Sequence, residues 1–201
     1  MSQATQHKRI RSLRQRRISE RNEIRQQLIL RNNLEKRFFR RLNSLFRKFM
    51  RVQMFLYREY GIYEQTNAVQ ALNEDLIPLI QAHYRRVFRA IYDFNENKYE
   101  DNYKQDAIVF GRSVDFENVV SQYFNTRQLI LTGISVRMAN RISKIIEQGR
   151  LDNLTLPQIA KLVSEKFLPI SRARAALIAR TETHSAASFA NHSYHKTVQE
   201  R

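Results

Sequence analysis

The residue types that could hold a metal ion gather near the end of the chain, at Glu182, His184, His192 and His195. His192 and His195 are three residues apart, so on a helix both imidazoles lie on one face. His184 lies two turns earlier, and a zinc site would need a further ligand from elsewhere in a chain without cysteine. We therefore interpret these histidines as polar surface residues and predict no metal site and no cofactor.

Sequence motifs of catalytic sites are also missing. The 201 residues contain no glycine-rich phosphate loop, no nucleophile elbow and no acid pair at an informative spacing. We predict a protein that is not an enzyme and has no catalytic residues.

Positive charge is concentrated in the first part of the chain. Residues 1–60 hold 17 Lys or Arg against 4 Glu, a net charge of +13, whereas residues 61–130 carry −3 and residues 131–201 carry +6. A solvated helix face normally mixes both signs, and arginine, whose fork matches phosphate and carboxylate, predominates over lysine here. We therefore expect this segment to contact a polyanion. The expected contact residues are Arg37, Arg40, Arg41, Arg47, Lys48 and Arg51.

The alternative interpretation is that these Lys and Arg residues form the solvated face of a helix that packs into a bundle. Phe38, Phe39, Phe46 and Phe55 accompany the arginines, so contact with a membrane surface is a second alternative. The chain has no apolar run of the roughly 20 residues that a membrane span needs, and the regular stripe described below favours helix packing. We therefore expect no membrane partner. Without a recognised helix-turn-helix or zinc-finger pattern, DNA binding would be non-specific.

Helices must position these residues, because Gly (4) and Pro (3) are too scarce for a β fold rich in turns. The predicted class is all-α: a long basic N-terminal helix and a helical hairpin, followed by a small C-terminal helical domain. Residues 1–14 have few apolar residues, so we predict a flexible basic tail there. The long helix should end at Gly61. Its apolar stripe runs through Leu34, Phe38, Leu42, Leu45, Phe49, Val52 and Leu56.

The second helical block spans about 64–97, and Pro78 predicts a boundary or kink near residues 73–78. The polar composition of residues 95–106 predicts an exposed loop, which is the candidate domain boundary. The predicted units are therefore the tail 1–14, the hairpin arm 15–100 and a compact helical domain 107–198.

The C-terminal part contains more residues that typically start or end a helix. Residues 132–135 predict a turn, with Ser135 as the N-cap of a helix that ends at Gly149. Thr155 and Gln158 form a capping pair that opens the next helix, which should end before Pro169. Ser171 is then expected to cap a last helix that runs to about residue 195.

The stretch Arg174–His184, RAALIARTETH, closely resembles the signature helix of the phage head-morphogenesis family called Mu F-like, the minor head proteins. In that family the helix follows a short one with an L-x-x-I-A pattern, and residues 156–163, LPQIAKLV, take that place here. The resemblance covers about residues 128–195. Family members often carry a further segment after this helix, and no function of such a segment is carried over.

The resemblance implies a minor capsid protein present in few copies at the portal vertex of the virion, and in the host cytoplasm during assembly. It would act in head morphogenesis, genome packaging or delivery. The expected partners are the portal protein, a capsid or scaffold protein and, from the charge, DNA. Long apolar stripes in a small protein also predict an oligomeric or partner-bound state.

The motif residues Arg180, Thr181, Glu182 and His184 have two open interpretations. Arg180 and Glu182 are two residues apart, so they do not face one another on a helix and should bond to different partners. They either brace the packing of the domain or form a contact surface for another protein. For the whole chain, the alternative function is a non-specific architectural DNA-binding protein.

Overall fold

The computed structural model describes residues 3–102 and 116–199, and every secondary-structure element in these ranges is an α-helix. The prediction of an all-α fold is therefore confirmed. The four helices are α1 (Gln3–Tyr60), α2 (Gln65–Asn102), α3 (Phe116–Leu151) and α4 (Leu156–Gln199).

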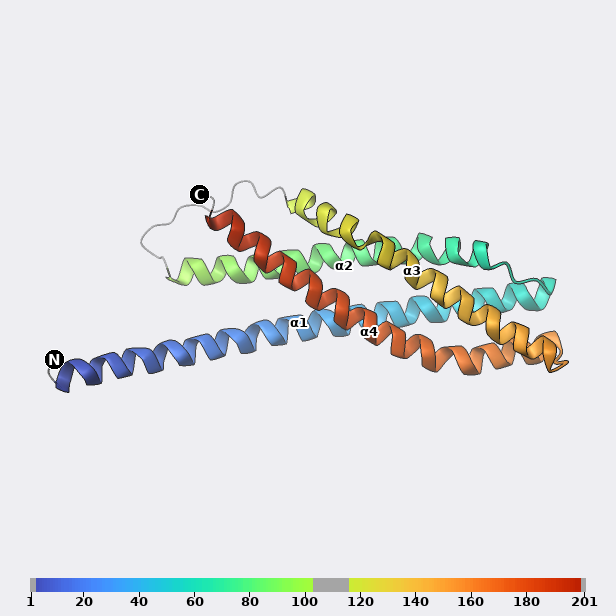
Figure 1. Ribbon diagram of the computed structural model, residues 1–201, viewed down its shortest axis with the longest axis horizontal. Coiled ribbons are helices and arrows are strands. Elements are labelled where there is room, and N and C mark those ends of the chain that lie inside the picture. The colour runs from blue at the N-terminus through green and yellow to red at the C-terminus, as the bar shows by residue number, and fades with distance from the viewer. Residues whose placement is uncertain (1–2, 103–115, 200–201) are drawn as a thin grey trace.

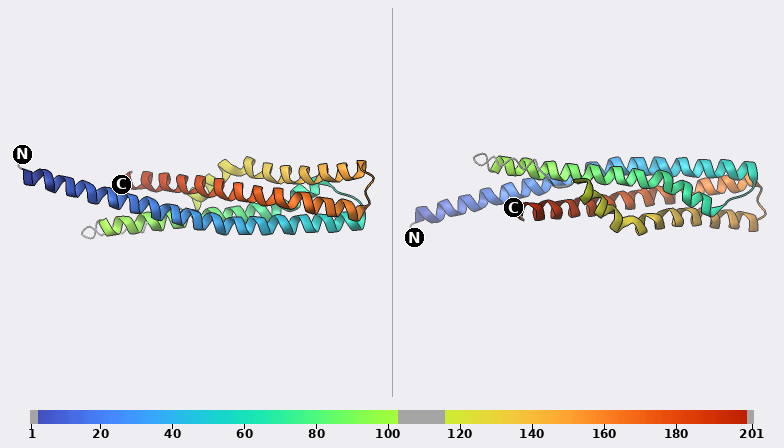
Figure 2. Two further views of the ribbon diagram at one scale, coloured as in Figure 1. Left: turned by 90° about the horizontal axis from the view of Figure 1, so that it is seen from below. Right: turned by 90° about the horizontal axis from the view of Figure 1, so that it is seen from above.

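The helices form an elongated bundle of two antiparallel hairpins, α1–α2 and α3–α4 (Figure 1). The side views show α1 and α2 in one layer and α3 and α4 in the other (Figure 2). Both tight turns lie at the same end, where the Arg150 guanidinium donates a hydrogen bond to the Gly61 carbonyl at 3.2 Å. The N-terminal part of α1 extends beyond the other end of the bundle (Figure 2).

One hydrophobic core runs through all four helices. Its largest fully buried side chains include Phe38 and Tyr57 of α1, Tyr84 of α2, Leu131 of α3 and Phe167 of α4. A single shared core differs from the predicted arrangement, in which a helical arm projects from a separate C-terminal domain. The apolar stripes of α1 and α2 are buried against α4 and α3, because a two-helix hairpin alone would leave them in water. The helical backbone of α1 also reaches back to Gln3, into the segment 1–14 that was expected to form a tail.

The α1 helix ends where the sequence predicts. Gly61 has φ of 69°, a left-handed conformation that glycine adopts without a Cβ clash, and its N–H donates to the Tyr57 carbonyl at 2.9 Å. The predicted stripe is correct as far as Phe49, but Val52 and Leu56 are 46% and 39% exposed. Beyond Phe49 the buried side chains include Met50, Met54 and Tyr57, because α4 crosses α1 obliquely and a different side of α1 is covered there (Figure 1).

The start of α4 also agrees with the sequence prediction. Thr155 donates from both its backbone N–H and its hydroxyl to Gln158 Oε1, each at 2.8 Å. The glutamine side chain thereby satisfies a backbone donor that has no partner within the helix.

Two predicted breaks in the C-terminal half are wrong. The expected turn at residues 132–135 lies inside α3, and Ser135 is fully buried mid-helix rather than an N-cap. Pro169 lies inside α4, and the Ser171 hydroxyl donates to the Leu168 carbonyl at 2.9 Å instead of capping a new helix. Proline removes one backbone hydrogen bond, while a continuous α4 keeps its small residues packed on both sides of that position.

The predicted loop at residues 95–106 is wrong as far as the structure describes it. Pro78 lies inside α2, which continues through Asn102, and residues 103–106 lie outside the described part. Asn95 is only 2% exposed and donates from Nδ2 to Asn191 Oδ1 at 2.9 Å. A cross-helix hydrogen bond therefore offsets the burial of this polar side chain.

Candidate functional site

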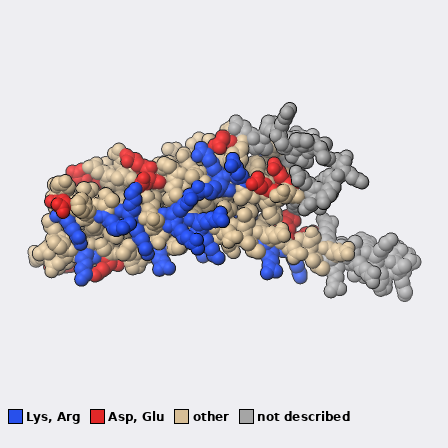
Figure 3. Space-filling view, turned by 180° about the vertical axis from the view of Figure 1, so that it is seen from behind, with Lys and Arg blue, Asp and Glu red and all other residues tan. Residues whose placement is uncertain are grey.

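The predicted contact residues Arg37, Arg40, Arg41, Arg47, Lys48 and Arg51 are all exposed on α1. Figure 3 shows the rear face of the bundle, formed by α1 and α2, with lysine and arginine gathered across its middle. Lys48 differs from the others because its Nζ lies 3.1 Å from Asp75 Oδ2 of α2. The two charges largely neutralise each other there, so this predicted contact is the weakest of the set.

The structure brings three of these arginines together around a hollow between α1 and α2. The hollow has a volume of about 270 Å³. Its lining residues are Leu34, Arg37, Phe38, Arg40, Arg41, His83 and Arg86. Arg47 and Arg51 lie outside this lining, farther along α1. Sequence reasoning missed Arg86, because it sits in a segment whose net charge is negative and only the packing of α2 places it beside α1.

His83 is a buried member of this lining, at 3% exposure. Its ring stacks on Phe38 with centroids 3.8 Å apart, and its Nε2 lies 2.8 Å from the Thr183 hydroxyl. Burial, and then the positive charges of Arg86 and Arg41, lower the pKa of His83 to about 3. The imidazole is therefore neutral at physiological pH and adds no charge of its own.

Glu182, the acidic residue of the R-T-E motif, is buried at 3% exposure between three helices. It accepts hydrogen bonds from Arg127 of α3, at 3.1 Å from Nε and 2.6 Å from Nη2, and from the Tyr84 hydroxyl of α2 at 2.5 Å. Contact with Glu182 raises the pKa of Arg127, while burial followed by the charge of Glu182 raises the pKa of Tyr84. Both carboxylate oxygens are occupied from inside the protein, so this arrangement holds helices together.

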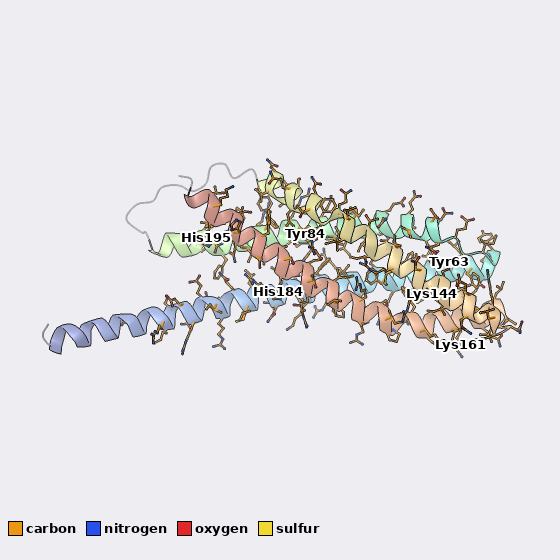
Figure 4. All side chains as sticks on the ribbon, viewed as in Figure 1. Tyr63, Tyr84, Lys144, Lys161, His184 and His195 are labelled. Carbon is orange, nitrogen blue, oxygen red and sulfur yellow. The ribbon has the colours of Figure 1, made fainter. Side chains whose placement is uncertain are left out.

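Arg180 and His184 face a different helix from Glu182. The Nε of Arg180 and the Nε2 of His184 lie 3.5 Å from the two carboxylate oxygens of Glu35 on α1. Figure 4 shows His184 where α4 crosses α1. The prediction that Arg180 and Glu182 bond to different partners is thereby confirmed. Thr181 is exposed, so the motif divides into a buried glutamate and an accessible group on α4.

The network around the motif depends on residues that sequence reasoning did not single out: Glu35, His83, Tyr84, Arg127 and Thr183. One weak signal existed for Arg127, the last base in the acidic segment 61–130. For His83 and Thr183, which are 100 residues apart, no local pattern shows the contact.

Within residues 3–102 and 116–199, no three His, Asp or Glu side chains are placed to hold a metal ion together. His192 and His195 are both exposed, and Figure 4 shows His195 near the C-terminal end of α4. No described helix is long and apolar enough to cross a membrane.

Comparison with known proteins connects the chain to a curated phage protein. The chain is 27% identical over 157 residues to the minor head protein GP7 of Bacillus phage SPP1, covering 71% of this chain and 50% of the relative. The chain is thus related to a phage minor head protein. It spans about half the length of that minor head protein. No protein-family model matches the chain, so membership of the Mu F-like branch stays a prediction. No solved structure matches it either.

Proposed function

We propose that this chain is a minor head protein that acts in phage head morphogenesis near the portal, with its α1–α2 face in contact with DNA. The relationship to a minor head protein supports the place of action. The proposed DNA contact is supported by the concentration of exposed arginines on this face, beside a hollow whose lining contains no acidic residue.

The geometry of the basic face suits the phosphates of duplex DNA. Arg37 and Arg51 are separated by 14 residues of a continuous helix, which is about 21 Å at the helical rise. This length corresponds to about six base pairs, given roughly 3.4 Å per phosphate along a strand. The arginines lie on the side of a bundle, where α2 and α4 flank α1. The contact is therefore with the backbone and independent of base sequence.

An acidic surface of the portal or of a capsid or scaffold protein is the other polyanion that this face fits. The motif residues Arg180, Thr181 and His184 on α4 offer a second contact surface for such a partner, because they are accessible whereas Glu182 is not. The alternative function, a non-specific architectural DNA-binding protein, is favoured by the same basic face. It requires DNA and no portal.

Co-purification separates these functions. The tagged protein is expressed with the neighbouring portal protein, treated with nuclease and washed in low and high salt. Retention of the portal at high salt without nucleic acid supports the minor head function. Loss of the portal on nuclease or salt treatment, with DNA binding intact, favours the architectural alternative.

A charge-reversal variant tests the DNA contact directly. Changing Arg37, Arg40, Arg41, Arg47 and Arg51 to Glu should abolish binding to duplex DNA, because each neutralised phosphate contributes to the salt-dependent affinity. The matched control reverses five exposed Lys or Arg residues of the other layer: Arg137, Arg141 and Lys144 of α3 and Lys166 and Arg172 of α4. If the five-arginine variant bound DNA as tightly as the parent, the proposed DNA contact would be abandoned.

A further inference from the structure

The hollow between α1 and α2 has the composition of an anion site. Arg37, Arg40 and Arg41 approach it from α1 and Arg86 from α2, while Leu34, Phe38 and His83 form the rest of the lining. The lining therefore carries four permanent positive charges and no carboxylate. Because two helices contribute the guanidinium groups, the site exists only in the folded bundle.

The four arginines of the hollow lack the ion pairs that other bases of the bundle have. Lys48 pairs with Asp75, Arg85 with Glu117, Arg127 with Glu182 and Arg180 with Glu35. Among the described residues, no carboxylate lies within ion-pair distance of Arg37, Arg40, Arg41 or Arg86. Four guanidinium groups of one sign around a shared concavity repel one another, and an anion placed between them would relieve that repulsion.

The charges of the hollow also act on buried His83. Its pKa is lowered by burial and, beyond that, by the charges of Arg86 and Arg41. A carboxylate in the hollow would have opposed this effect of the two arginines.

We propose that this hollow binds one phosphate group, held by the guanidinium groups of Arg37, Arg40, Arg41 and Arg86. A phosphate offers several acceptor oxygens in a tetrahedral arrangement, which guanidinium forks from two directions can engage together. A carboxylate offers only two oxygens, in one plane, so it engages fewer of these groups. The phosphate comes from a nucleic-acid backbone or from phosphate in solution, and the nucleic-acid source rests on the DNA contact proposed above.

The test uses the full chain, with Arg86→Gln as the diagnostic variant and Arg141→Gln as the control. Both residues are exposed, and each substitution removes one charge, from α2 and from α3 respectively. Arg86 lies on α2, outside the set of contact residues predicted from the sequence. An effect of its substitution therefore points to the hollow and not to the basic face of α1. In chloride buffer, Arg141→Gln should unfold at the temperature of the parent. Arg86→Gln should unfold at that temperature or slightly above it, because it relieves part of the repulsion in the hollow.

The first measurement is the melting temperature in sodium phosphate against sodium chloride of equal ionic strength. Phosphate should stabilise the parent and Arg141→Gln, because a ligand that binds only the folded state raises its stability. Arg86→Gln should lose most of this gain. The second measurement is the affinity for duplex DNA as a function of salt, where Arg86→Gln should reduce the slope of log K against log salt by about 1.

The outcomes distinguish a DNA phosphate from phosphate in solution, and the proposed phosphate site from the proposed DNA contact. Loss of phosphate stabilisation together with a reduced DNA slope supports a backbone phosphate in the hollow. Loss of phosphate stabilisation with an unchanged slope supports a site for phosphate from solution. Equal phosphate stabilisation and equal slopes in Arg86→Gln and Arg141→Gln overturn the site. Absence of salt-dependent DNA binding by the parent would remove the DNA contact, while the inorganic-phosphate measurement would still decide the site.

Discussion

Arg127 and Glu182 form a two-pronged ion pair across the bundle, with N–O distances of 3.1 and 2.6 Å. Their side chains are 19% and 4% exposed, so the pair is shielded from water on most sides. The Tyr84 hydroxyl donates to the same carboxylate. One glutamate of the R-T-E motif thereby joins α2 and α3 to α4.

Substitution of Glu182 should destabilise the protein strongly. In Glu182→Gln the guanidinium of Arg127 stays in place without a counter-charge, and breaking a buried pair in this way typically costs about 3 kcal/mol or more. Urea unfolding measures the loss. The control is Glu165→Gln, which breaks an exposed pair with Lys161 and should cost less than about 1 kcal/mol. Equal stability of the two variants would contradict the bracing role of Glu182.

Arg180, although two residues away, should behave differently. Its side chain is 73% exposed and its contact with Glu35 is long, at 3.5 Å, so Arg180→Ala should cost less than about 1 kcal/mol of stability. If α4 also contacts a partner through this residue, the variant should lose the portal in the co-purification while it unfolds like the parent. A loss of several kcal/mol in urea unfolding would instead assign Arg180 to the core architecture.

The stability of the bundle should fall between pH 7 and pH 4, in part because of His83. Its pKa in the folded state is lowered to about 3, whereas in the unfolded chain it is near 6.5. As the pH falls through 6.5, the unfolded state takes up a proton that the folded state does not bind, so acid favours unfolding. The expected cost is about 2 kcal/mol at pH 5 relative to pH 7.

The variant His83→Gln isolates this contribution. Glutamine does not titrate, and its amide offers a replacement for the hydrogen bond with the Thr183 hydroxyl. The difference in unfolding free energy between parent and variant should therefore shrink as the pH is lowered. A difference that stays constant from pH 7 to pH 4 would show that folding does not shift the pKa of His83.

Two glycines of α3 should respond in opposite directions to alanine. A Cβ at Gly149 would lie 2.8 Å from Ile159 Cγ1 of α4, so Gly149→Ala forces the helices apart and should cost about 1–3 kcal/mol. A Cβ at Gly133 meets the mobile end of Arg137 at 3.3 Å, within a continuous helix. Gly133→Ala should therefore stabilise the protein by about 0.5–1 kcal/mol.

Thermal or urea unfolding of both alanine variants checks this contrast. Destabilisation by Gly133→Ala would indicate that residues 132–135 form a turn after all, as the sequence predicts. Tolerance of alanine at Gly149 would mean that α3 and α4 lie farther apart than the structure shows.

Local features of the sequence determined the helical class and two of the helix boundaries. Gly61 ends α1 and the Thr155–Gln158 pair starts α4, because these depend on groups within a few residues of each other. The exposure of Arg37, Arg40 and Arg41 also followed from the sequence, because a charged side chain is rarely buried without a partner of opposite charge.

Contacts between distant residues decided the rest. Only the packing of α2 against α1 brings Arg86 to the arginines of α1, and only the approach of α3 buries Glu182 against Arg127. The continuity of α4 through Pro169 likewise reflects burial along its whole length, which outweighs a local preference for a break. These arrangements are stabilised by groups up to 100 residues apart, as in the hydrogen bond of His83 with Thr183. No local sequence pattern predicts such pairs.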